Sequence, residues 1–141
     1  MNGRNDPAIR SVLVVDDEAG LREMLAFALA DLGYQVTSVP TGEDALAIAS
    51  REPFALVLCD IMMPGIDGIE VLKGIKELQP DAEVILSTGH ATLETAVRAR
   101  ESGAFDYIAK PYELDQLCAI FDRALARRGA KARPFSRIME V

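Results

Sequence analysis

The chain has 141 residues, half of them hydrophobic and 26% charged, so a single domain with a packed core is expected. Its formal net charge of -7 makes it a poor candidate for binding nucleic acid through its own surface, and better suited to Mg²⁺ or a basic partner. We find no membrane-spanning run and no signal peptide in the sequence. Cys59 and Cys118 lack metal-binding spacing, which favours buried thiols in a reducing cytosol and predicts a cytoplasmic protein.

The first part of the chain predicts two strands and two helices. After a loose polar arm over residues 1–10, an apolar strand over Ser11–Val15 leads into a helix with apolar residues at helical spacing. Gly33 is placed to end that helix. The alternating stretch Tyr34–Val39 predicts an edge strand, and Thr41 is expected to cap a short second helix.

The rest of the chain continues the same alternation. Strands are expected over Phe54–Asp60, Glu83–Ser87 and Phe105–Ala109, and helices over Gly68–Leu78, Thr92–Ser102 and Glu113–Arg128. The helix over Thr92–Ser102 has only a weak apolar stripe, chiefly Leu93, Ala96 and Val97. Gly129 is expected to close the last helix, so that residues 129–141 form a basic tail or linker.

A strand and a helix alternate five times, which predicts an α/β domain over residues 11–128. Such a pattern favours a doubly wound, flavodoxin-like sheet of five parallel strands covered by five helices on both faces. With Tyr34–Val39 at one edge, the simplest strand order is 2-1-3-4-5. That order places the point where the winding reverses between the first and third strands, and open α/β sheets bind their ligands there.

Polar residues end the strands that meet at this point. Asp16 and Asp17 follow the first strand and Asp60 ends the third, while Thr88 and Lys110 follow the fourth and fifth. Three crowded carboxylates repel one another, and a hard dication such as Mg²⁺ relieves the repulsion. A metal, a cation and a hydroxyl around one carboxylate suit phosphoryl transfer, with Asp60 as the nucleophile.

Each of these residues taken alone also has a structural interpretation. Asp16 and Asp17 could cap the first helix, and a lone Lys110 is more often a solvated lysine. His90, the one histidine, fits a loop residue beside the site better than a metal ligand. The order of the groups, each at the end of its own strand, favours the functional interpretation.

Four motifs resemble the receiver domain of bacterial two-component response regulators. They are Val14–Glu18, Asp60–Gly68, Ser87–Gly89 and Lys110–Pro111. The resemblance covers Ser11 to Arg128, and the sequence of Gly103–Pro111 is similar to that of regulators of the nitrogen-regulation type. It implies a cytoplasmic signalling switch that controls a downstream output such as transcription, and that catalyses only its own phosphorylation and dephosphorylation.

The resemblance also implies roles for individual residues. Asp60 corresponds to the phosphoacceptor, which receives its phosphoryl group from a phosphohistidine of a sensor histidine kinase or a phosphotransfer protein. The implied ligands of Mg²⁺, or of Mn²⁺ in its place, are Asp17 and Asp60, the backbone carbonyl of Met62, and Asp16 through water. Mg²⁺ or Mn²⁺ is the implied cofactor.

Three further residues would bind the phosphoryl group or respond to it. Thr88 and Lys110 correspond to its binding groups, and Tyr107 to the aromatic switch residue that turns inward when Thr88 moves. The implied output surface comprises the Thr92–Ser102 helix, the Phe105–Ala109 strand and the Glu113–Arg128 helix. It would bind a partner or a second copy after phosphorylation, and the chain itself would bind neither nucleic acid nor membrane.

Two alternative classes stay open at this point. A phosphatase of the haloacid-dehalogenase type also uses an aspartate at a strand end, but it has an acid two residues later, where this chain has Met62. A receiver-like interaction module that is never phosphorylated would not need all five polar groups. The sequence names neither the kinase nor the output domain.

Overall fold

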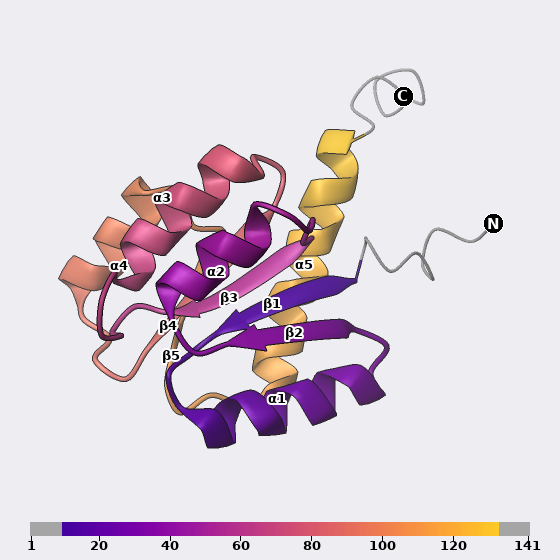
Figure 1. Ribbon diagram of the computed structural model, residues 1–141, viewed down its shortest axis with the longest axis horizontal. Helices are drawn as coiled ribbons and strands as arrows, with labels where there is room; N and C mark the ends of the chain where they lie inside the picture. Colours follow the sequence, from indigo (N-terminus) through magenta and orange to yellow (C-terminus); the bar gives the residue numbers. More distant parts are fainter. Residues whose placement is uncertain (1–9, 133–141) are drawn as a thin grey trace.

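The computed structural model describes residues 10–132, so most of the expected arm and tail lies outside the described residues. Five parallel strands form one sheet in the order β2-β1-β3-β4-β5, which confirms the predicted α/β topology (Figure 1). They are β1 (Ser11–Val15), β2 (Gln35–Val39), β3 (Leu56–Asp60), β4 (Glu83–Thr88) and β5 (Asp106–Ala109).

Helices cover both faces of the sheet and bury a core on each. They are α1 (Ala19–Asp31), α2 (Gly42–Ala49), α3 (Gly68–Leu78), α4 (Leu93–Glu101) and α5 (Leu114–Ala132). Apolar residues of α2, α3 and α4 pack on one face, and those of α1 and α5 on the other (Figure 1). Within residues 10–132, no helix is long and apolar enough to cross a membrane.

The strand register brings the predicted polar residues to one edge of the sheet. Val15 lies opposite Cys59 and Asp60 opposite Ser87, so the residues that follow β1 lie beside the end of β3. The helix after β3 starts very close to this edge. A Cβ added at Gly68 would lie 2.5 Å from the carbonyl oxygen of Asp60, so only glycine lets α3 begin against the strand end without a shift.

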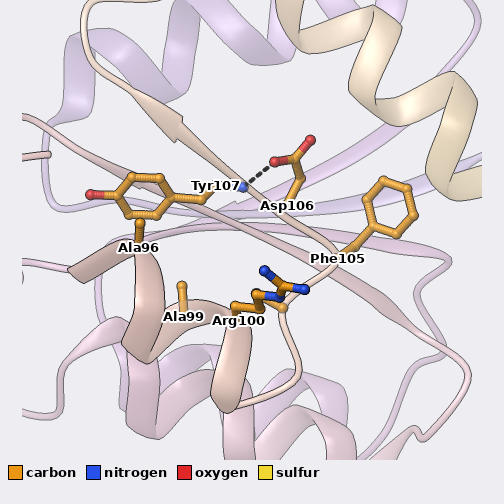
Figure 2. Close-up of a pocket in the computed structure, with 7 residues that line it drawn as sticks. Ala96, Ala99, Arg100, Phe105, Asp106 and Tyr107 are labelled. Atoms are coloured by element: carbon orange, nitrogen blue, oxygen red, sulfur yellow. Dashed lines mark hydrogen bonds between the residues drawn. The ribbon is translucent and has the colours of Figure 1, made fainter. Parts of the chain in front are cut away.

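The apolar stripe expected on α4 is wrong at Leu93 and Val97, although Ala96 does lie on the side that faces β5. Leu93 is 82% and Val97 43% exposed, and Ala99 is the buried residue of this helix. The side of α4 that faces β5 carries small residues, and a cavity of about 270 Å³ lies between the helix and the strand, with Ala96, Ala99, Phe105 and Tyr107 among its lining (Figure 2). The larger side chains point to solvent because the alanine face is the one packed on the sheet.

Two smaller expectations also need correction. Gly129 does not close the last helix, since α5 continues through it to Ala132. A glycine inside a helix costs only about 1 kcal/mol relative to alanine, which a well-anchored helix tolerates. Cys59 is buried as expected, but Cys118 is only partly buried.

An ion pair between a half-exposed arginine and a buried carboxylate anchors α5 at the edge of the sheet opposite the predicted site. The Glu83 side chain, at the start of β4, is fully buried, and it accepts hydrogen bonds from Nε and Nη2 of Arg127, both at 2.7 Å. The same guanidinium lies 4.6 Å from the ring centre of Phe105. One turn earlier, Arg123 pairs with Asp106 at 3.1 Å. The end of α5 is therefore fixed to β4 and to the start of β5.

Candidate functional site

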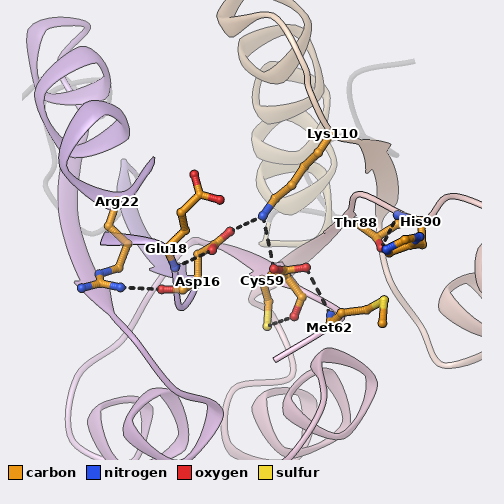
Figure 3. Close-up of polar contacts among 9 residues, drawn as sticks. Asp16, Glu18, Arg22, Cys59, Met62, Thr88, His90 and Lys110 are labelled. Atoms are coloured by element: carbon orange, nitrogen blue, oxygen red, sulfur yellow. Dashed lines mark hydrogen bonds and ion pairs between the residues drawn. The ribbon is translucent and has the colours of Figure 1, made fainter. Parts of the chain in front are cut away.

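Asp60, the last residue of β3, lies at the centre of the predicted site. Its side chain is only 9% exposed. Its Oδ1 accepts a hydrogen bond from the backbone N–H of Met62 at 3.2 Å, and its Oδ2 accepts one from Nζ of Lys110 at 3.2 Å (Figure 3). One carboxylate oxygen thus faces the turn after β3, and the other faces the lysine that follows β5.

Asp16 holds the same lysine more closely. Its Oδ2 lies 2.7 Å from Nζ of Lys110, and its Oδ1 accepts from the backbone N–H of Glu18 at 3.0 Å (Figure 3). Arg22, on the first turns of α1, donates to the carbonyl oxygen of Asp16 at 2.7 Å. The loop between β1 and α1 is thereby fixed from both sides, with a carboxylate directed at the sheet edge.

The charges at this edge are only partly balanced. Burial raises the pKa of Asp60, even though the ammonium of Lys110 and the Met62 hydrogen bond lower it. Burial lowers the pKa of Lys110, but its hydrogen bond and attraction to Asp16, together with Asp60, raise it overall. The lysine therefore stays charged, while the carboxylate of Asp60 lies in a place where its negative charge is disfavoured.

The third aspartate completes a group of oxygen donors. Asp16, Asp17 and Asp60 each offer a carboxylate oxygen, and these oxygens all lie within 4.8 Å of one another. Asp17 is exposed to solvent while the other two are buried. Carboxylate oxygens are the ligands that Mg²⁺ and similar hard cations prefer, and one ammonium cannot balance three carboxylates. The donor set therefore fits a divalent cation.

The remaining predicted residues differ in how they relate to this group. Thr88 is buried at the end of β4, and its Oγ1 accepts from the backbone N–H of His90 at 3.0 Å (Figure 3). The exposed Met62 side chain points away from the core, although its N–H binds Asp60. Tyr107 is directed elsewhere, because its hydroxyl lies 2.6 Å from Oγ1 of Thr95 on α4.

Two residues near the site were not singled out from the sequence. Arg22 lies one helical turn after Glu18, and that spacing is the signal that could have placed it beside the β1–α1 loop. Tyr112 lines a pocket of about 450 Å³ together with Glu18 and Lys110. Burial raises the pKa of Tyr112 to about 12, and its hydroxyl has no hydrogen-bond partner among the described residues. Nothing in the sequence marks Tyr112.

Comparison with known proteins decides the family. Residues 12–122 match the family described as the response regulator receiver domain. The chain belongs to this family. The receiver domain from Methanospirillum hungatei JF-1, described as CheY-like, has 31% identity and a TM-score of 0.83, covering 86% of this chain and 98% of that one. The fold and the predicted resemblance are therefore both confirmed.

The similar curated proteins are larger regulators. The DNA-binding transcriptional regulator NtrC of Salmonella typhimurium strain LT2 is 42% identical over 87% of this chain, which spans 26% of that protein. AtoC of Escherichia coli K12 is 42% identical over 88% of the chain and 27% of its own length. The chain is thus a receiver domain of NtrC-like regulators, spanning about a quarter of the length of these relatives.

One solved relative carries the modification that the resemblance implies. A response regulator from Burkholderia pseudomallei, with a phosphorylated aspartic acid, calcium ion and citrate, is 30% identical with a TM-score of 0.77. The match covers 88% of this chain and 73% of that one.

Proposed function

We propose that this receiver domain accepts a phosphoryl group on Asp60 from a phosphohistidine of a sensor histidine kinase or a phosphotransfer protein. The observation that carries the proposal is the buried Asp60 carboxylate, which shares one ammonium with Asp16. The phosphorylated aspartate of the Burkholderia pseudomallei relative supports the same chemistry here.

The residues at the sheet edge divide the work of the transfer. A carboxylate oxygen of Asp60 attacks phosphorus while the bond from phosphorus to the imidazole nitrogen breaks, and the nitrogen keeps the electron pair. Lys110 lies 3.2 Å from Asp60 and neutralises charge on the phosphoryl oxygens. Thr88 accepts one hydrogen bond through Oγ1, and its own O–H donates to the phosphoryl group as a charge-assisted bond.

The oxygen donors of the site would hold Mg²⁺, or Mn²⁺ in its place. Asp16, Asp17 and Asp60 supply carboxylates, and we assign the backbone carbonyl of Met62 to the same set. The cation would supply positive charge to the phosphoryl oxygens, which one lysine cannot neutralise alone.

The output follows from the position of the switch residues. Thr88 ends β4, and Tyr107 lies in the neighbouring β5, so movement of one reaches the surface of α4, β5 and α5. We assign partner binding or phosphorylation-dependent pairing of two domains to this surface. DNA binding, which the name of NtrC states, would belong to parts of the relatives beyond this domain. The expected location of the protein is the cytoplasm.

Phosphorylation of single variants tests the proposal. With Mg²⁺ and a small phosphodonor, intact-mass spectrometry should show one added phosphoryl group on the wild type and none on Asp60→Asn. Asp67→Asn is the matched control, because Asp67 caps α3 through a bond to the Glu70 N–H that asparagine can replace. Equal labelling of Asp60→Asn and Asp67→Asn would show that another residue is modified.

A further inference from the structure

The hydroxyl of Thr95 takes part both in the N-terminal cap of α4 and in a contact with β5. It takes part in the N-terminal capping box of α4, where the N–H of Thr92 donates to Oγ1 of Thr95 at 3.0 Å, and the N–H of Thr95 donates to Oγ1 of Thr92 at 3.1 Å. The same Oγ1 lies 2.6 Å from the hydroxyl oxygen of Tyr107 on β5. Thr95 thus connects the start of α4 directly to Tyr107 on β5.

The hydroxyl of Thr95 has more polar neighbours than one hydroxyl can bond at the same time. A threonine hydroxyl has one proton and two lone pairs. The Thr92 N–H uses one lone pair, and the carbonyl oxygen and Oγ1 of Thr92 lie 3.0 Å and 3.1 Å from Oγ1 of Thr95. The Tyr107 hydroxyl, at 2.6 Å, is the nearest of these neighbours, and either hydroxyl can be the donor in that bond. The cap of α4 and the bond to Tyr107 therefore share one hydroxyl group.

Little else fixes the first turn of α4. Leu93 and Val97 are exposed, and the buried residue, Ala99, lies in the second half of the helix. Between α4 and β5 lies the cavity of about 270 Å³, with Ala96, Ala99 and Tyr107 in its walls (Figure 2). A helix with so little apolar contact depends strongly on its polar links, and loosely packed elements change position most easily.

We propose that the hydrogen bond between Tyr107 and Thr95 is a latch that holds α4 in the position it has before phosphorylation. Thr95 is the positioning residue, and it acts through the cap that it forms with Thr92. When the Tyr107 side chain turns away, the latch opens and the cap loses one of its partners. The inference rests on the proposed phosphorylation of Asp60 and names the contact that phosphorylation must break.

The latch predicts a linked change at the phosphorylation site. A contact present only in the unphosphorylated arrangement lowers the affinity of every ligand that favours the phosphorylated arrangement. Removing the contact must therefore raise the affinity of such a ligand. Loss of one hydrogen bond of ordinary net strength shifts such an equilibrium by about fivefold. Beryllofluoride, a phosphoryl mimic, should therefore bind Tyr107→Phe and Thr95→Val about fivefold more tightly than the wild type.

Three variants and their combination test the latch. Thr95→Ser keeps both the cap and the latch and should match the wild type in beryllofluoride affinity. Tyr107→Phe removes the latch and leaves the cap, so amide hydrogen exchange over Thr92–Val97 should accelerate even without beryllofluoride. In a double-mutant cycle, Tyr107→Phe should add almost nothing once Thr95 is valine, because the bond is already absent.

The outcomes separate this inference from the proposed function. Equal effects of Tyr107→Phe in the wild-type and Thr95→Val backgrounds, or unchanged exchange over Thr92–Val97, would overturn the latch while leaving phosphorylation of Asp60 intact. Failure of beryllofluoride to bind the wild type would count against the proposed function, and the exchange measurement without beryllofluoride would still decide on the latch.

Discussion

Asp60 and Glu83 are two buried carboxylates on neighbouring strands, at opposite edges of the sheet, and they are compensated very differently. Glu83 has a guanidinium to itself, with two hydrogen bonds of 2.7 Å from Arg127. Asp60 shares the ammonium of Lys110 with Asp16 and lies farther from it, at 3.2 Å against 2.7 Å. Burial raises the pKa of Asp60, which shows how incomplete its compensation is.

The difference separates a carboxylate that fixes the fold from one that is kept reactive. A buried carboxylate held by two hydrogen bonds from one guanidinium is costly to disturb, since the carboxylate stays in the interior when that guanidinium is removed. A buried carboxylate that shares its only ammonium with a second carboxylate is incompletely neutralised, which favours binding of a cation or attack on an electrophile. Three measurements test this contrast.

The largest effect is expected at Glu83. Arg127→Ala leaves a fully buried carboxylate without its guanidinium, and should lower the free energy of unfolding by about 2–3 kcal/mol, at the low end for buried pairs because the Arg127 side chain is 45% exposed. Arg123→Ala is the matched control one turn away, in a pair with a 63% exposed arginine, and should cost under about 1 kcal/mol. Urea denaturation measures both, and equal losses would remove the distinction between the two ion pairs.

A smaller effect is expected from Mg²⁺ at the other edge. Binding to the folded state alone should stabilise the wild type by about 1.4 kcal/mol when Mg²⁺ is at ten times its dissociation constant. Asp17→Asn should reduce this gain without disturbing the core, because Asp17 is exposed. Thermal unfolding with and without Mg²⁺ checks it. A gain that is the same in Asp17→Asn would remove that carboxylate from the ligand set.

The smallest effect concerns the cost of the Asp60 charge itself. Without Mg²⁺ at pH 7, Asp60→Asn should raise the free energy of unfolding by about 1 kcal/mol, because it removes a buried and poorly compensated carboxylate. The pKa of Asp60 is raised in the folded state, so folding takes up a proton on acidification. The advantage of asparagine should therefore shrink as the pH falls through that raised pKa. An advantage that grows on acidification would contradict the direction of the shift.

The Asp60 side of this contrast could be predicted from the sequence, because the periodicity of apolar residues places Asp60 at the end of a buried strand. Apolar runs that end in Asp16 and Asp60 mark buried strands, and the alternation with helices fixes the strand order that brings these ends together. The positions of Thr88 and Lys110 follow from the same rule. Local patterns suffice wherever a residue's place depends on the end of its own strand.

The parts that were missed depend on contacts distant in sequence. Glu83 reads as an ordinary strand residue, and its partner Arg127 lies 44 residues later on α5. The burial of α4 depended on which of its faces met β5, and a nine-residue helix with only four apolar residues does not settle this by its own pattern. The Tyr107–Thr95 bond likewise needs two elements already placed beside each other.

The continuity of α5 past its last anchor has a geometric consequence. The helix is held to the sheet at Arg127 and continues without interruption to Ala132. Each helical residue turns the chain by about 100° and advances it by about 1.5 Å, so Arg127 sets the angular phase of the backbone that follows. Deleting Gly129 would turn the helical residues after it, as far as Ala132, by about 100° about the helix axis, whereas inserting seven residues there would nearly restore the original phase. The anchor at Arg127 therefore sets the rotation of the last turn of α5.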